Sequence, residues 1–155
     1  MKLAYTKASP GDASVLAQLR IDFIMEYRGS QPDEIINNIR REFTSYFEKA
    51  LLDGSCISFL CKSGDEVVGT GAIVFRLQPG NLQNPSGRYG YVMNMYTKPS
   101  FRKNGIGNTI LNMLMDEARS LGIKAFELHA TPDGEPVYLR NGFQIHNQPT
   151  LKKFE

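Results

Sequence analysis

The segment at residues 99–122, PSFRKNGIGNTILNMLMDEARSLG, has two glycines and two cations at the start of a strongly helical run. The first turn of a helix leaves four backbone N–H groups without intrahelical acceptors, and the helix dipole adds about half a positive charge there. Gly105 and Gly107 lack the Cβ atoms that would hold a phosphate away from these amides, while Arg102 and Lys103 add charged donors. The segment therefore predicts a pyrophosphate site, although similar glycine pairs also occur in tight strand-to-helix connections without a ligand.

The common nucleotide-binding patterns do not fit this segment. It contains no Gly-Lys-Ser/Thr sequence of a P-loop, and it lacks the third glycine of the dinucleotide fingerprint. Metal chemistry is not indicated either, because the two histidines and two cysteines of the chain do not have the spacing of zinc ligands. The predicted anion site must therefore belong to another class of protein, and no metal is expected.

The first half of the chain predicts two helices and a hairpin. Ser9-Pro10 begins one helix, which ends near Gly29, and the apolar spacing of a second helix starts after Pro32 and stops at Gly54. The period then changes to that of strands at CISFLCKSGDEVVGTGAIVF, with a turn at residues 63–65. Cys56 and Cys61 are about 16 Å apart in such a strand, so we expect two buried thiols and no disulfide.

The second half predicts a crossover unit. Residues 78–90 are rich in Gly, Pro and Asn and indicate a long exposed connection. A buried strand at 91–97, the glycine-led helix ending at Gly122 and a strand at 124–131 follow, and this order implies a right-handed parallel crossover. A short helix ending at residues 141–142 and a final strand or hairpin containing Pro149 complete the prediction.

The elements have the order ααββ-βαβ-αβ, which predicts an α+β (mixed α/β) fold. Its centre would be one mixed sheet with helices on both faces. The 155 residues show no break in composition, so we expect a single domain over residues 1–155. This domain is long enough to bury a sizeable core.

Charge and hydropathy exclude some partners. A net charge of +2 is too small to predict nucleic-acid binding. No run of 18 apolar residues predicts a membrane span, and residues 1–10 have no apolar core of signal-peptide length. The expected location is cytoplasmic, without nucleic-acid or membrane partners.

Three linked motifs resemble the GNAT-type N-acetyltransferases. Residues 102–107, RKNGIG, match that family's Arg/Gln-x-x-Gly-x-Gly/Ala phosphate loop, which follows a strand and an x-Pro pair, here within MNMYTKP. Downstream, GEPVYLRNGF places Tyr138 and Gly142-Phe143 as in the family's Tyr-x-x-x-Gly-Phe segment. The resemblance covers residues 91–143, and the preceding helices and hairpin agree with the family topology.

The resemblance implies acetyl-CoA as the acetyl donor and assigns its contacts. The pantetheine arm would lie along Met95, Tyr96 and Thr97, where a bulge near Met95 would separate two parallel strands. The backbone N–H of Met95 would be the oxyanion donor, and Tyr138 the general acid toward the leaving thiolate, although this tyrosine also fits an amphipathic core position. The pyrophosphate would bind the amides and side chains of Arg102, Lys103, Asn104, Gly105, Ile106, Gly107 and Asn108.

The general base is not fixed by the resemblance. Many relatives carry a glutamate on the strand before the phosphate loop, where this chain has Met93-Asn94-Met95. Glu127 and His129 share one face of the next predicted strand and are candidate bases, as is an ordered water, but either side chain also fits a purely structural role. Thr131 and Gly134 replace an asparagine and an alanine of many relatives, so a pantetheine contact from that asparagine is not expected.

The predicted function is therefore transfer of an acetyl group from acetyl-CoA to a primary amine, most simply of a small molecule. The alternatives are a protein or peptide amine acetyltransferase and a non-catalytic acyl-CoA sensor. Glu26 and the loop at 78–90 are candidates for the acceptor pocket, and surface solvation explains both equally well. A homodimer is a further expectation from similar proteins, whereas the acceptor itself cannot be named from spacing.

Overall fold

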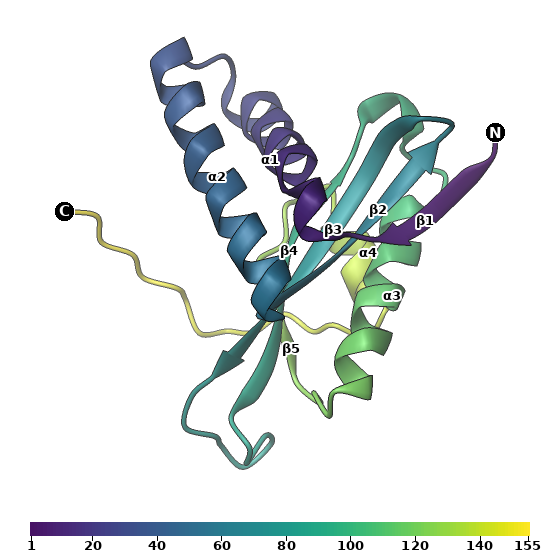
Figure 1. Ribbon diagram of the computed structural model, residues 1–155. Coiled ribbons are helices and arrows are strands. Elements are labelled where there is room, and N and C mark those ends of the chain that lie inside the picture. Colours follow the sequence, from purple (N-terminus) through teal and green to yellow (C-terminus); the bar gives the residue numbers. More distant parts are fainter.

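The computed structural model describes residues 1–155 as one five-stranded sheet with helices on both faces (Figure 1). The strands lie in the order β1-β2-β3-β4-β5; the first four pair antiparallel, and β4 pairs with β5 in parallel. Their bounds are β1 Leu3–Lys7, β2 Cys56–Ser63, β3 Glu66–Leu77, β4 Arg88–Thr97 and β5 Phe126–Glu127. The mixed fold class predicted from the sequence is confirmed.

The helices form two layers around this sheet. Helices α1 and α2 cover one face, and α3 covers the other, with the short helix α4 beside it (Figure 1). Two 3₁₀ turns, η1 and η2, precede α1 and α3. The bounds are η1 Pro10–Asp12, α1 Ala13–Arg28, α2 Asp33–Asp53, η2 Pro99–Phe101, α3 Ile106–Ser120 and α4 Glu135–Arg140.

Local signals place the helix ends close to where the sequence predicts them. The Ser9 N–H donates to the Asp12 carboxylate over 2.9 Å, which caps the turn leading into α1. Gly29 follows the last residue of α1, and Gly54 ends α2 in the left-handed conformation. These short-range caps explain why the two long helices could be delimited from the sequence.

Two apolar clusters, one on each face of the sheet, hold the layers together. On the α1/α2 face, Leu16, Phe47 and Leu60 are almost completely buried. On the α3 face, the corresponding residues are Ile73, Ile110 and Leu114. Cys56 and Cys61 are buried free thiols, one in each cluster, as predicted. Each large side chain fully buried in this way contributes about 1.5–3 kcal/mol, so the two clusters fix the sheet between its helices.

A bulge interrupts β4 at its centre. The β3–β4 register passes from Ala72↔Met93 to Thr70↔Tyr96, so one residue of β3, Gly71, faces two residues of β4. A Cβ atom at Gly71 would lie 2.3 Å from the Met95 sulfur and 2.7 Å from Ile110 on α3, which explains the glycine. The expected bulge near Met95 is thus present, and it includes Asn94 with a φ of 55°.

The parallel strands β4 and β5 separate soon after they meet. Their ladder contains only Gly90↔Phe126 and Tyr91↔Glu127. The predicted strand at 124–131 is therefore mostly unpaired, and residues 92–97 of β4 have no strand on that side. The separation agrees with the one that the sequence resemblance implies.

Two predictions at the ends of the chain differ from the structure. The predicted order omits β1, a short edge strand that pairs with β2. Only two of its residues, Leu3 and Tyr5, pack against the core, and this pattern is too short to indicate a strand. The predicted final strand is wrong, because residues 143–155 form no strand. The C-terminal end of this segment extends away from the body of the protein (Figure 1). With only two paired residues, β5 is too short an edge to hold another strand, and Pro149 lacks a backbone donor.

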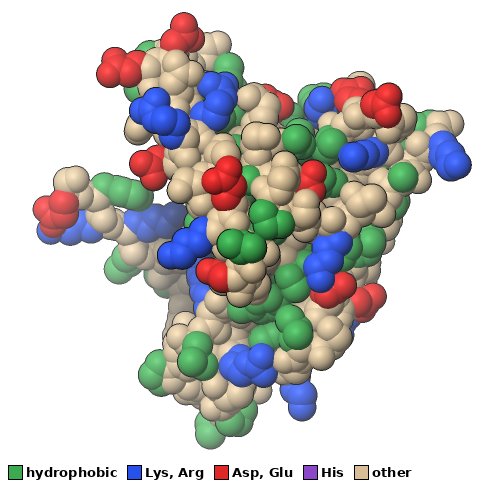
Figure 2. Space-filling view, in the orientation of Figure 1, with side chains coloured by type: hydrophobic (Ala, Val, Ile, Leu, Met, Phe, Trp, Pro, Cys, Tyr) green, Lys and Arg blue, Asp and Glu red, His purple; other side chains and the backbone are tan.

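The surface carries both signs of charge. Figure 2 shows Lys and Arg side chains interspersed with Asp and Glu over the visible face, without a continuous basic stripe. No helix combines the length and the hydropathy needed to cross a bilayer.

Candidate active site

The loop between β4 and α3 has the backbone shape of an anion cradle. Lys103 and Gly105 both adopt left-handed conformations, with φ of 65° and 75°. The Asn104 side chain donates to the backbone oxygens of Phe101 and Arg102 over 2.9 Å and 3.2 Å, which holds the turn closed. This arrangement brings the first turn of α3 directly after the loop.

The backbone N–H groups of residues 103–108 find no acceptor within the protein. The first backbone bond back into this region is donated by Thr109 to the Gly105 oxygen, over 3.0 Å. Space is open around the absent Cβ atoms of both Gly105 and Gly107. Since consecutive free amides at a helix start attract anions, the residues fit the pyrophosphate of coenzyme A.

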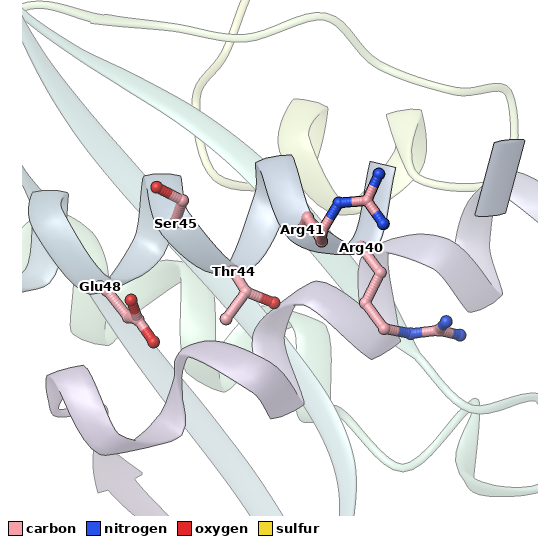
Figure 3. A pocket seen from close by; sticks show the side chains of 5 residues that line it. All are labelled: Arg40, Arg41, Thr44, Ser45 and Glu48. Carbon is pink, nitrogen blue, oxygen red and sulfur yellow. The ribbon is translucent and has the colours of Figure 1, made fainter. Parts of the chain in front are cut away.

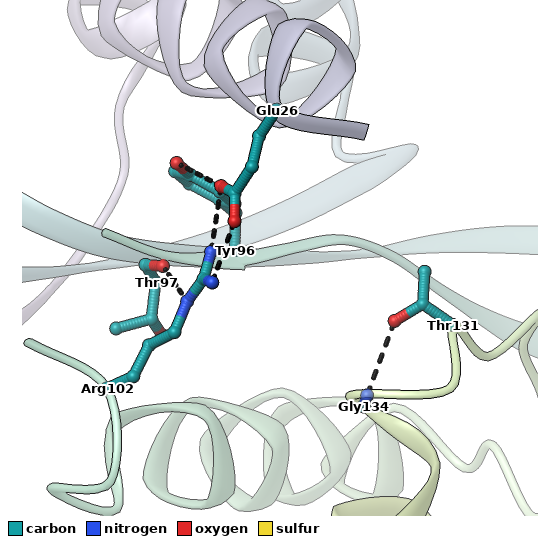
Figure 4. Close-up of polar contacts among 6 residues, drawn as sticks. All are labelled: Glu26, Tyr96, Thr97, Arg102, Thr131 and Gly134. Carbon is teal, nitrogen blue, oxygen red and sulfur yellow. Dashed lines mark hydrogen bonds and ion pairs between the residues drawn. The ribbon is translucent and has the colours of Figure 1, made fainter. Parts of the chain in front are cut away.

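Arg102 joins this loop to α1 through Glu26 (Figure 4). Its Nη1 lies 2.7 Å from Glu26 Oε1, its Nη2 donates to Oε2 over 2.9 Å, and its Nε donates to the Thr97 oxygen over 2.9 Å. The Tyr96 hydroxyl also donates to Glu26 Oε2, over 2.9 Å. The sequence suggested Glu26 only as a candidate for the acceptor pocket; its contact with the loop cation had no local signal.

Charge and burial shift the pKa values of this group. The hydrogen bond from Arg102 lowers the pKa of Glu26, so the carboxylate stays charged to a lower pH than an ordinary glutamate does. Burial, reinforced by the neighbouring Glu26, raises the pKa of Tyr96 to about 12. The side chains of Arg102 and Glu26 remain 39% and 38% exposed, so solvent weakens their ion pair.

Met95 presents its backbone to the gap between β4 and β5. The Lys98 N–H donates to Val68 on β3, whereas the Thr97 oxygen points away from β3 and accepts from Arg102. Because the backbone polar groups of a strand alternate between its two edges, those of Met95 point the same way as those of Thr97. An N–H on this edge is suitably oriented to meet an acyl oxygen in the gap.

Tyr138 lies on α4 and packs against the same apolar cluster as Met95. Its ring meets Phe143 edge to face at 6.0 Å, and burial raises the pKa of its phenol. The hydroxyl has no hydrogen-bond partner in the protein and carries its proton at neutral pH. A half-buried phenol that is protonated and has no hydrogen-bond partner can donate a proton to a thiolate.

Thr131 and Gly134 shape the turn that precedes α4. The Gly134 N–H lies 3.3 Å from Thr131 Oγ1 and 3.1 Å from the Thr131 backbone oxygen (Figure 4). A Cβ atom at Gly134 would lie 3.1 Å from the Tyr138 ring. The two residues that depart from the family pattern thus form a compact turn against the Tyr138 side chain.

Glu127 and His129 both lie beside Tyr91. The His129 ring meets the Tyr91 ring edge to face at 5.7 Å, and the charge of Glu127 helps to raise the pKa of Tyr91, after the larger effect of burial. Both side chains are exposed, and no hydrogen bond joins them. Each is thus placed relative to Tyr91, and the two side chains form no acid–imidazole pair.

Arg20 and Asn94 meet on the α1/α2 side of the bulge. Arg20 Nη1 lies 3.5 Å from Asn94 Oδ1, and its guanidinium carbon lies 5.2 Å from the centre of the Phe43 ring on α2. Burial lowers the pKa of Arg20. The sequence did not identify Arg20, because a single cation on α1 is not a signal for a site.

Two further features are the long loop before β4 and a hollow on α2. The loop at residues 78–87 precedes β4, whereas the glycine loop follows it, so the two occupy opposite ends of a ten-residue strand. A hollow on α2 is lined by Arg40, Arg41, Thr44, Ser45 and Glu48, and none of these residues is hydrophobic (Figure 3). No group of His, Cys, Asp and Glu residues has the arrangement of a metal site.

Comparison with known proteins identifies the class. The sequence matches the acetyltransferase (GNAT) family over residues 18–143, and the chain belongs to that family. It is an enzyme of the acetyl-CoA-dependent N-acetyltransferase class. A comparison with curated proteins finds no match.

Solved structures agree with this assignment. A predicted acetyltransferase from Clostridium acetobutylicum, crystallised with acetyl-CoA, is 32% identical, has a TM-score of 0.88 and aligns over 98% of this chain and 96% of its own. A GCN5-related N-acetyltransferase from Ralstonia eutropha is 22% identical with a TM-score of 0.86, over 98% and 99% of the two chains. Glucosamine-6-phosphate N-acetyltransferase from Arabidopsis thaliana is 17% identical with a TM-score of 0.72, over the full length of both. Because the last two structures are less than 25% identical to this chain, they show only that the fold is shared.

Proposed function

We propose that this protein transfers the acetyl group of acetyl-CoA directly to a primary amine of a small molecule. The observation that carries the proposal is the run of free amides at residues 103–108, which begins beside the unpaired edge of β4. The pyrophosphate of the donor binds these amides, with the loop side chains of Arg102, Lys103, Asn104 and Asn108 around it. The pantetheine arm extends along Met95, Tyr96 and Thr97.

Met95 and Tyr138 carry the transfer step. The Met95 N–H stabilises the negative charge that develops on the thioester oxygen during attack by the amine. The C–S bond breaks as the new C–N bond forms, and Tyr138 gives its proton to the departing sulfur. The raised pKa of this phenol supports the role, because the proton is present throughout the neutral range.

The amine must lose a proton during the reaction. No carboxylate is present at the bulge, where Met93, Asn94 and Met95 are the strand residues. The nearest carboxylate and imidazole on the neighbouring segment are Glu127 and His129, and both reach solvent. We propose that one of them, or a water molecule between them and the amine, accepts this proton.

A small acceptor is favoured over a protein chain by the surroundings of Asn94. The side chain is overlaid by Arg20 of α1, and Arg20 in turn contacts Phe43 of α2. Two helices therefore cover the acceptor side of the bulge. An extended peptide would need an open groove there, whereas a compact amine needs only a short approach.

The proposal is tested by release of free thiol from acetyl-CoA in the presence of a panel of small amines and lysine-containing peptides. We expect turnover with at least one small amine and little with the peptides. Turnover confined to peptides would replace the small-molecule assignment. Binding of acetyl-CoA without turnover of any amine would favour the alternative, a non-catalytic sensor. This alternative is kept because the strand before the phosphate loop has no carboxylate to act as a base.

A further inference from the structure

Arg20 has no anionic partner in the protein. None of the ion pairs in the structure includes it. Its only hydrogen bond is the long contact to Asn94 Oδ1, at 3.5 Å. The ionisable groups that influence it electrostatically are the phenols of Tyr91 and Tyr46, and neither is a carboxylate. A partly buried guanidinium normally has a carboxylate or several acceptors as partners. Arg20 has neither, so most of its N–H groups have no acceptor in the protein.

Asn94 adds a second unused donor at the same place. Its Nδ2 is buried and has no hydrogen-bond partner, whereas its Oδ1 faces Arg20. Buried polar atoms without partners are uncommon, and each one calls for an explanation. Asn94 lies in the bulge that follows the Ala72–Met93 pair, and from there its side chain reaches Arg20 of α1. The bulge does not supply an acceptor for the Nδ2 hydrogens.

The walls around these donors are aromatic and uncharged. Phe43 of α2 lies under the Arg20 guanidinium, and burial raises the pKa values of Tyr46 and Tyr91, so both phenols remain neutral. Beyond Tyr91, Arg76 stacks on the ring at 3.8 Å, and Glu127 is the one acid whose charge influences this tyrosine. Arg20, the cation that contacts Asn94, therefore has no carboxylate partner in the protein.

We infer that Arg20 and the Asn94 amide bind the carboxylate of the acceptor, so that the natural acceptor is an amino acid or a similar carboxylate-bearing amine. This rests on the proposed function and assigns the substrate class of the same site. A carboxylate supplies the anionic partner that Arg20 lacks, and its planar group can accept from a guanidinium and an amide together. Consecutive Cα atoms are about 3.8 Å apart, so Asn94 lies beside the Met95 amide over which the amine reacts. That spacing suits an amine and a carboxylate on the same or neighbouring carbons.

The test compares matched acceptors that differ only in the carboxylate. Thiol release from acetyl-CoA is followed with L-leucine, L-methionine and L-phenylalanine, and with the corresponding amides. We expect kcat/KM for at least one acid to exceed that of its amide by about 30-fold. The neutral amide cannot supply the negative charge that the Arg20 and Asn94 donors would otherwise bind. The amides have the more readily deprotonated amines, so this preference would run against intrinsic reactivity.

Two variants separate the carboxylate contact from general effects. Arg20→Gln should reduce the acid-to-amide ratio to about one, while Arg41→Gln removes an exposed arginine from α2 and should leave the ratio unchanged. Melting temperatures show that each variant is folded. Equal use of acids and amides by the wild type, or a ratio insensitive to Arg20→Gln, would overturn the inference while leaving the acetyltransferase intact.

A binding measurement keeps the inference testable if no amine is turned over. N-acetyl-L-leucine, an analogue of the expected product, is titrated calorimetrically into the protein saturated with coenzyme A. We expect binding that Arg20→Gln weakens about tenfold or more. Binding that is equally strong in both proteins, or absent from both, would contradict the carboxylate site, whereas failure of the proposed function would show as absent thiol release.

Discussion

The proposed donor and acceptor halves of the site are built in different ways. The donor half consists of consecutive backbone amides at residues 103–108, shaped by left-handed Lys103 and Gly105. The proposed acceptor half consists of the side chains of Arg20 and Asn94, which are 74 residues apart in the chain and meet at the bulge of β4. A site made of main chain depends on local conformation, whereas a site made of side chains depends on the packing of three elements.

The largest effect is expected from closing the donor half. Gly107→Val places a branched side chain in the open space at the start of α3. We expect the affinity for coenzyme A to fall by two to three orders of magnitude, on the order of the loss of several charge-assisted hydrogen bonds. Isothermal titration measures the affinity, and the melting temperature should change little because valine is tolerated in a helix at least as well as glycine.

Gly11→Val is the matched control for this substitution. Gly11 also has an ordinary φ and room for a side chain, but it lies in η1, before α1. It should bind coenzyme A like the wild type. Near-normal binding by Gly107→Val would mean that the open space at this glycine is not used by the donor.

Tyr138→Phe should lower kcat about 100-fold while leaving the affinity for acetyl-CoA nearly unchanged. The raised pKa means that the wild-type phenol keeps its proton through neutral and mildly alkaline pH. Wild-type kcat should therefore decline only at a pH above the ordinary pKa of a phenol, and the variant should lack this decline. A pH profile of kcat measures both, and an unchanged kcat would assign Tyr138 to packing alone.

Asn94→Asp tests the acceptor half without touching the donor half. The new carboxylate would stand where Oδ1 now lies 3.5 Å from Arg20 and would neutralise the cation internally. We expect KM for a carboxylate-bearing acceptor to rise about tenfold, with no change in coenzyme A binding. Initial-rate kinetics with both substrates varied separates the two constants. A rise in the dissociation constant of coenzyme A instead would mean that the halves are not independent.

The smallest effect is expected at Glu26, which joins α1 to the donor loop through Arg102. Glu26 and a pyrophosphate attract the same guanidinium, so Glu26→Gln should strengthen coenzyme A binding about threefold, consistent with a partly exposed ion pair worth less than about 1 kcal/mol. Because the pKa of Glu26 is lowered, the difference should be complete at neutral pH and vanish as pH falls through that lowered pKa. Weaker binding by the variant would instead make Glu26 a residue that positions Arg102.

Local signals explain which parts of the fold could be predicted. Ser9, Gly29 and Gly54 delimit two helices by capping, and Gly64 with its positive φ closes the hairpin. The strand at 124–131 and the final strand were predicted from composition, but pairing requires a neighbouring edge, and β5 offers only two residues. Strand composition alone does not specify such an edge.

The same division applies to the site. The glycine loop and Tyr138 could be found because each lies within a short motif, and the bulge at Met95 was expected from the family resemblance. The Arg20–Asn94 contact could not be found, since no spacing rule relates an α1 side chain to a bulged residue of β4. The sequence showed Asn94 only as a residue without a basic group beside Met95, and it gave no sign of the unpaired amide.

The central claim is that the amides of residues 103–108 bind the pyrophosphate of coenzyme A. Calorimetric titration of the purified protein with coenzyme A and, separately, with pantetheine, which lacks the pyrophosphate, tests it most directly. The account predicts that coenzyme A binds about 100-fold or more tightly than pantetheine. Equal affinity for the two, or no heat of binding for coenzyme A at millimolar concentration, would contradict it.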